Sequence, residues 1–141
     1  MGALTVGINV QTRNMSGVKR GSAVVANAVV VKKGSLICAN SSSEAILCAD
    51  LGAAGYFLGI AKNDVTGDGT KTVEYEYNLE ALLDCEAGVT YALINKTVYA
   101  MTDAGVTNAS TVGPAVGVLK ELQTSSRAWV LLCGATLAAN T

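Results

Sequence analysis

Cysteine thiols and neighbouring carboxylates are the side chains with which this sequence could perform chemistry. Its 141 residues include four cysteines and no histidine. A Ser-His or Cys-His nucleophile pair therefore cannot form, and no two cysteines have the C-x-x-C spacing of a zinc site. A Gly-x-Ser-x-Gly elbow and a Walker-type loop are also absent. The sequence predicts no catalytic, cofactor-binding or metal-ligating residues, and we expect a protein that is not an enzyme.

Each cysteine lies in a short apolar run, and the four are Cys38, Cys48, Cys85 and Cys133. A free cysteine in such a run behaves as a small hydrophobic residue and is usually buried. We therefore predict four buried free thiols. The alternative is that Cys38 and Cys48 face each other across a hairpin and form a disulfide.

Two groups of carboxylates resemble functional sites. Residues 64–69, DVTGDG, copy the first half of a calcium loop, but Tyr75 occupies the twelfth position, where a bidentate glutamate is needed. We interpret the segment as a hairpin turn. Glu74 and Glu76 lie two residues apart on an expected strand and so share one face. We interpret that face as solvated or turned towards another subunit.

The composition favours association with other chains. Apolar residues make up 50% of the sequence and charged residues 15%, against about 25% charged residues in typical soluble domains. A surface this poor in charge is typical of a chain that contacts copies of itself or a partner, although a small alanine-rich domain is the simpler alternative. The net charge is −1 and the basic residues are scattered, so we expect no nucleic-acid partner.

Targeting and membrane-spanning signals are not visible in the sequence. The N-terminus lacks a basic start followed by a continuous apolar core, as a secretory signal would have. No window approaches the run of about 18 apolar residues that a membrane span requires. We expect the protein to be made and to act without export and without a membrane.

Short apolar runs separated by turn-forming residues extend through most of the chain. Residues 71–78, KTVEYEYN, alternate apolar and polar side chains in the manner of a half-buried strand. Residues 79–88 fit either one helical turn or another strand. The runs recur at the spacing of a β-meander. The sequence therefore predicts an all-β fold, a small antiparallel β-barrel or sandwich of about 8–10 short strands with little helix.

The first 22 residues differ from the remainder of the sequence. Residues 4–10, LTVGINV, predict one short strand, and the polar stretch after it is typical of an arm that is mobile or ordered by a partner. We divide the chain into an extended N-terminal arm (1–22), a β-barrel-like domain (23–134) and a short C-terminal tail (135–141).

Motifs in the second half of the chain follow one another in a fixed order. The residues that carry them are Lys96, Thr97, Val98, Tyr99, Asp103, Val106, Thr107, Pro114, Gly117, Val118, Glu121, Trp129, Val130 and Leu132. Upstream, a related element contains Phe57, Gly59, Ile60 and Asp64, and residues 32–50 read as an opening hairpin. Over residues 31–134 this order resembles the capsid decoration, or cement, proteins of tailed phages.

The resemblance implies a small β-barrel-like domain, usually a homotrimer, that binds the outside of a phage head and stabilises contacts between neighbouring capsomers. It implies the major capsid protein and copies of the same chain as partners, and the capsid surface of the virion as location, after assembly in the host cytoplasm. It also favours a strand at residues 79–88. On this basis we expect that deleting residues 2–20 leaves a folded oligomer that no longer attaches to capsids.

The alternative function is a β-barrel module that binds a ligand or glycan on the phage particle. Trp129, Tyr75 and Tyr77 would then form an aromatic platform. The sequence around the tryptophan, AWVLL, is instead typical of a core strand.

Overall fold

The computed structural model describes residues 4–50, 55–86 and 89–133, and these residues confirm the all-β prediction. They contain no α-helix, three 3₁₀ turns and ten strands of three residues or more, besides three strands of two residues. The strands are β1 (Thr12–Arg13), β2 (Lys19–Val24), β3 (Val30–Val31), β4 (Leu36–Ala39), β5 (Ala45–Leu47), β6 (Tyr56–Ala61), β7 (Val65–Thr66), β8 (Thr72–Tyr77), β9 (Leu79–Cys85), β10 (Thr97–Thr102), β11 (Gly105–Thr107), β12 (Ala115–Thr124) and β13 (Arg127–Leu132). The 3₁₀ turns are η1 (Met15–Gly17), η2 (Cys48–Asp50) and η4 (Tyr91–Leu93).

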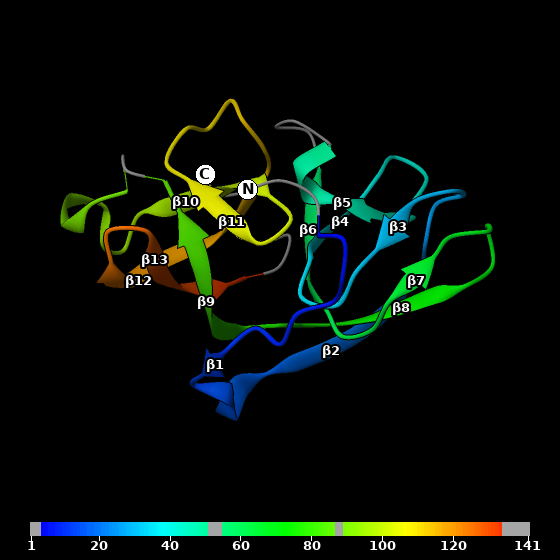
Figure 1. Ribbon diagram of the computed structural model, residues 1–141, viewed down its shortest axis with the longest axis horizontal. Coiled ribbons are helices and arrows are strands. Elements are labelled where there is room, and N and C mark those ends of the chain that lie inside the picture. The colour runs from blue at the N-terminus through cyan, green and yellow to red at the C-terminus, as the bar shows by residue number, and fades with distance from the viewer. Residues whose placement is uncertain (1–3, 51–54, 87–88, 134–141) are drawn as a thin grey trace.

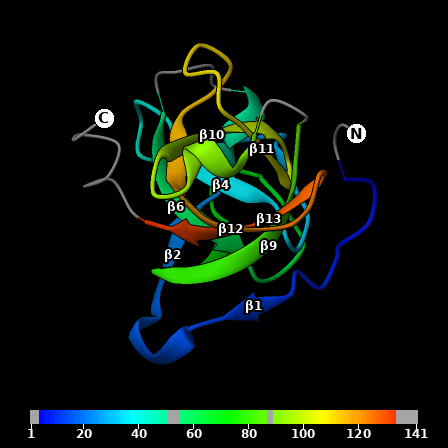
Figure 2. The same ribbon diagram turned by 90° about the vertical axis from the view of Figure 1, so that its left-hand side faces the viewer.

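Five strands of the second half of the chain close into a barrel in the order β9-β11-β10-β12-β13 (Figure 2). Its last seam joins β13 to β9 in antiparallel register, from Leu79 opposite Leu132 to Asp84 opposite Arg127. Its shortest seam is the parallel pairing of β11 with β9. The sheet returns to its first strand, and β1 pairs with the part of β9 that the short β11 does not reach.

A second sheet has the strand order β2-β8-β6-β4-β5, and the pair β3–β7 forms a separate two-stranded sheet (Figure 1). This second sheet curls without closing. Its two ends meet only where Val25, just beyond β2, forms a parallel bridge with Ala45 at the start of β5. The rest of the outer edge of β2 has no partner strand among the described residues.

The chain passes from the second sheet into the barrel through a single residue, Asn78, between β8 and β9. Asn78 has φ of 63°, in the left-handed region that asparagine tolerates better than most residues. β9 is buried along almost its whole length, from Leu79 to Cys85. The structure thus confirms a strand, and not a helical turn, in this segment.

The main hydrophobic core fills the space shared by the barrel and the second sheet. It includes Leu119 and Leu132 from the barrel and Leu36 and Phe57 from the second sheet. A smaller cluster joins the second sheet to the β3–β7 pair and contains residues such as Ile37. Burial on both faces explains why β4 and β6 carry near-continuous apolar runs, whereas β8 alternates apolar and polar residues.

The N-terminal segment does not follow the prediction. Residues 4–10 form no strand, and Ile8 donates one backbone hydrogen bond to the carbonyl of Lys33. β1 pairs with β9 of the barrel, and β2 pairs with β8 of the second sheet. The expected boundary at residue 22 therefore falls inside β2. Deleting residues 2–20 would remove β1 and part of β2, so we no longer expect that deletion to leave the fold intact.

Candidate functional site

A buried carboxylate joins three strands of the second sheet. Glu76 of β8 is 6% exposed, and it contacts Arg20 of β2 and Lys62, which directly follows β6. Its Oε2 accepts a hydrogen bond from Arg20 Nε at 2.9 Å, and its Oε1 lies 3.2 Å from Lys62 Nζ. Two cations compensate the buried charge, as a carboxylate at this depth requires.

This burial corrects the expectation that Glu74 and Glu76 share a solvated face. Only Glu74 is exposed, because β6 brings Lys62 over its neighbour. A hollow of about 410 Å³ lies beside the ion triad and is lined by Arg20, Gly21, Ser22, Lys62, Glu74, Tyr75 and Glu76. Its two cations and two carboxylates balance, so the hollow does not select a ligand by charge.

The calcium-like segment bends the chain at residues 68–70 but is not the predicted hairpin turn, because Val65 and Thr66 form β7, which pairs with β3 and not with β8. Asp68 Oδ1 accepts backbone hydrogen bonds from Lys71 and Thr70, each at 2.9 Å. These bonds, with the Lys71 amide contributing most, lower the pKa of Asp68 to about 2. Asp64 instead accepts a hydrogen bond from the backbone N–H of Lys33. The two carboxylates thus serve different loops, and no group of three or more potential metal ligands occurs in the described parts of the chain.

The prediction of four free thiols is wrong for two of them. Cys38 and Cys48 form a disulfide that connects β4 to η2. Both are fully buried in the main core. η2 packs against β10, so the bond holds β4 of the second sheet next to the barrel. The hairpin spacing had left this pairing open, and burial alone could not distinguish a thiol from a disulfide.

The other two cysteines are free, Cys85 at the end of β9 and Cys133 directly after β13. Cys85 is buried as predicted, whereas Cys133 is only half-buried. Burial raises the pKa of both thiols, so neither is held as a reactive thiolate.

An arginine cluster that the sequence analysis did not identify holds β1 against the barrel. The guanidinium carbon of Arg13 lies 4.2 Å from the centre of the Trp129 ring. The same group contacts Glu80 at 2.9 Å and Glu121 at 2.8 Å. The cation–π contact and the two ion pairs together cover the face of the tryptophan. No spacing in the sequence connects these residues, because they lie on four different segments.

The expected aromatic platform does not assemble. Trp129 belongs to the barrel and is 7% exposed, whereas Tyr75 and Tyr77 belong to β8 of the second sheet. The two tyrosine rings lie 6.1 Å apart and are tilted by 34°. Tyr75 also packs against the smaller core cluster. Trp129 is therefore buried, as the pattern AWVLL indicated, but beneath Arg13 and outside the main core, into which its neighbours Ala128 and Val130 pack.

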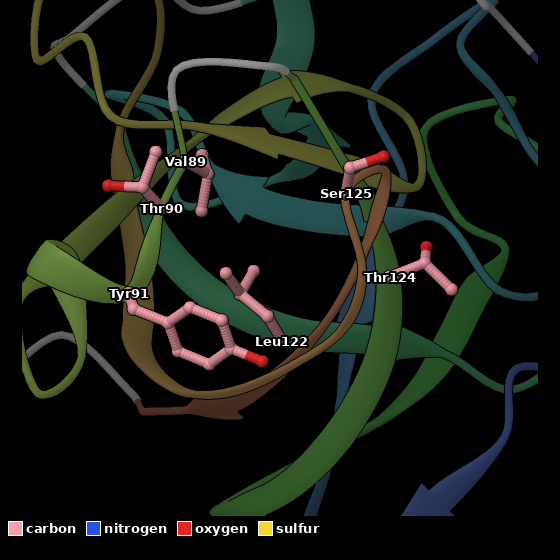
Figure 3. A pocket seen from close by; sticks show the side chains of 6 residues that line it. All are labelled: Val89, Thr90, Tyr91, Leu122, Thr124 and Ser125. Carbon is pink, nitrogen blue, oxygen red and sulfur yellow. The ribbon is translucent and has the colours of Figure 1, made fainter.

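An apolar groove of about 350 Å³ lies on the barrel between η4 and the hairpin that joins β12 to β13. Figure 3 shows the six side chains that line it, Val89, Thr90, Tyr91, Leu122, Thr124 and Ser125. Tyr91 is 72% exposed, and Leu122 packs against the main core. The residues that line the groove are apolar or uncharged polar, and none of them is charged.

One buried carboxylate lies in a motif of the resemblance. Asp103 is in the turn between β10 and β11, and its Oδ2 accepts a hydrogen bond from the backbone N–H of Leu4 at 2.9 Å. Its own carbonyl accepts the backbone N–H of Leu36 from β4. Burial raises the pKa of the Asp103 carboxyl, and the charge of Asp50 acts in the same direction. The turn thus fastens the N-terminal segment and the second sheet to the barrel.

No protein-family model matches the sequence, and no curated protein matches it. Among the helices in the described residues, none is long and apolar enough to cross a membrane. Two of the most developed polar contacts are the ion pairs of Glu76, which hold neighbouring strands of the second sheet together.

Proposed function

We propose that this chain is a viral structural protein, a capsid decoration or cement protein that binds the outside of a phage head and stabilises contacts between neighbouring capsomers. The proposal places the protein on the virion surface, with the major capsid protein and copies of itself as partners, and gives it no catalytic role. Its basis is the ordered set of motifs in residues 31–134, considered together with the fold in which those motifs lie.

The observation that carries the proposal is that the motifs of the second half of the chain coincide with one structural unit. Three of them fall on β10, β12 and β13, which are neighbouring strands of the closed barrel. Glu121 and Trp129, from the last two motifs, are opposite each other in the β12–β13 register. At Gly117 a Cβ atom would overlap the carbonyl oxygen of Leu131, so the motif glycine has a steric reason. The motif residues therefore support strand pairing and close packing, and the proposal gives them no part in a reaction.

A decoration protein would act by mass action. A ligand that binds the assembled shell and not separated capsomers raises the free energy needed to open the shell. At a free concentration of about 100 times its dissociation constant, each bound site adds about 2.7 kcal/mol. Weak individual contacts suffice when several copies are connected, because the second contact then forms at high effective concentration. The homotrimer that the resemblance implies would provide such a connection.

The test is attachment to shells made from the major capsid protein encoded in the same genome. Purified chain is mixed with purified expanded shells, and co-sedimentation and the shell melting temperature are measured. We expect saturable binding and a higher melting temperature. Gly117→Ala, which places a Cβ against the carbonyl oxygen of Leu131 and should destabilise the barrel, is expected to bind less. No co-sedimentation of the folded chain, or its absence from mature virions by mass spectrometry, would refute the proposal.

A further inference from the structure

β2 presents backbone hydrogen-bonding groups that no described residue uses. The register places Lys19 opposite Tyr77 and Val24 opposite Thr72, and the N–H of Val25 continues the ladder to the carbonyl of Lys71. In an antiparallel pair, bonded residues alternate with residues whose groups point to the other side. Residues 19, 21, 23 and 25 therefore bond to β8, and the groups of Arg20, Ser22 and Val24 point outward.

Two observations from neighbouring strands agree with this assignment. On β8, the carbonyl of Glu74, opposite Ser22, accepts the N–H of Lys62 and so is directed towards β6. At the other end, the N–H of Ala26 points to the same side as those of Arg20 and Ser22 and donates to the carbonyl of Ala45. Only that end of the β2 edge is therefore occupied. Exposed pairs of this kind are the usual templates for an added strand.

We infer that β2 pairs with β2 of a second copy of this chain, antiparallel and centred on Gly21. The N–H and C=O of Arg20 would bond to Ser22 of the partner copy, and the reverse pair would form by symmetry. The two five-stranded sheets would then join into one. The inference is independent of the proposed attachment to a phage head.

A second copy fits this edge because the free groups are arranged symmetrically. Arg20 and Ser22 lie one on each side of Gly21, so a twofold pairing centred there satisfies the four groups of these two residues in each copy. Arg20 would face a serine and Lys19 would face Ala23, so no like charges lie directly opposite each other. The charge of Arg20 is already compensated by Glu76. The low charge content of the chain also agrees with surface buried between copies.

Ser22→Pro tests the pairing because proline removes an N–H that points outward. Proline is tolerated on an edge strand where the missing N–H is not part of the ladder. We expect the wild-type chain to reach twice its mass of 14.4 kDa in a concentration series measured by sedimentation equilibrium. Ser22→Pro should lose the dimer, and Ser22→Thr, which keeps the N–H, should retain it. Circular dichroism and the melting temperature confirm that each variant is folded.

Should Ser22→Pro fail to fold, amide hydrogen exchange of the wild-type chain provides the same test. The N–H groups of Arg20 and Ser22 should become protected as the concentration rises, whereas that of Gly21, which bonds to β8, should be protected throughout. A dimer mass for folded Ser22→Pro, or exchange at residues 20 and 22 that does not depend on concentration, would overturn the inference.

Cysteine cross-linking tests the register. In the proposed dimer Lys19 and Ala23 of the partner copy form a non-hydrogen-bonded pair with Cα atoms about 4.5 Å apart, within reach of a disulfide. In a Cys133→Ser background, an equimolar mixture of Lys19→Cys and Ala23→Cys chains should cross-link. Lys19→Cys alone should not, because the two copies of residue 19 would lie about 13 Å apart along the strand. Cross-linking of Lys19→Cys alone, or none in the mixture, would exclude this register.

The oligomer mass separates this inference from the proposed function. A wild-type monomer at every concentration, or the trimer that the resemblance implies, would overturn the β2 pairing, whereas attachment to shells is measured separately by co-sedimentation. Conversely, a dimer that does not co-sediment with shells would refute the decoration proposal and leave the pairing intact.

Discussion

The barrel and the second sheet differ in how the backbone groups of their outer strands are satisfied. Both contain five strands, and both contribute to the main core. The barrel closes through the backbone hydrogen bonds of β13 and β9, whereas the second sheet meets itself at one bridge, between Val25 and Ala45. The second sheet compensates with contacts between side chains, the Cys38–Cys48 disulfide and the ion triad around Glu76.

The comparison shows where this protein can form new contacts. The barrel satisfies its backbone groups by closure and, on the part of β9 that β11 does not reach, through β1, so its side chains and loops are what it offers a partner. An incompletely closed sheet retains an edge, and its stability depends more on a few specific side chains. We therefore expect substitutions that displace the backbone to lower the free energy of unfolding most in the barrel. Substitutions that remove a single side-chain contact should lower it in the second sheet.

The same glycine-to-alanine change in each region should give the largest contrast. In the barrel, Gly117→Ala places a Cβ against the backbone oxygen of Leu131, which cannot move without opening the β12–β13 seam. In the second sheet, the Cβ of Gly21→Ala would lie 2.5 Å from the hydroxyl of Tyr75, at the end of a side chain that can rotate. We expect losses of about 3 and about 1 kcal/mol, measured by urea denaturation. Equal losses would contradict the distinction between the two regions.

Removing the disulfide should produce the next largest effect. The bond closes a loop between cysteines ten residues apart, and Cys38→Ala with Cys48→Ala should cost about 2.7 kcal/mol in the chain-entropy estimate. Cys133→Ser is the matched control, because this thiol is free and half-buried. Hydrogen exchange should increase in β4 and β5 more than in β12 and β13. A uniform increase would show that the bond does not stabilise the second sheet selectively.

Breaking the ion triad should have a smaller effect. Glu76→Gln removes the buried charge, but Arg20 and Lys62 can then be hydrated because their side chains are 70% and 42% exposed. We expect a loss of about 1.5 kcal/mol, near the lower end for hydrogen bonds to charged groups. Glu74→Gln, on the exposed side of the same strand, should change stability by less than about 0.5 kcal/mol. The two variants compared by chemical denaturation test whether burial decides the difference.

The pH dependence of the Asp103 turn should give the smallest effect. Burial raises the pKa of this carboxyl in the folded state above its unfolded value, so the folded protein binds more protons in that range. Stability should therefore fall as pH rises from about 4 through the raised pKa. Asp103→Asn should lack this component. The measurement is the difference in unfolding free energy between the two proteins over a pH series, and a constant difference would contradict the assignment.

Several elements were predictable because their cause is local. The alternation of Val73 and Glu74 along β8 follows from the two-residue period of a strand. The bend after β7 was predictable because Asp68 bonds to the backbone of residues close to it in sequence. For β9 the periodicity was ambiguous, since a strand buried on both faces does not alternate.

The sequence by itself determined the class of fold, the absence of a histidine-dependent reaction site and the burial of Trp129, because these depend on residue type and short-range pattern. Only the tertiary structure decided which cysteines pair, that Glu76 is buried between Arg20 and Lys62, and that β2 keeps an open edge. These features arise where segments distant in the chain meet. Sequence patterns record the environment of each residue, but the pairing of strands depends on the free energy of the whole arrangement.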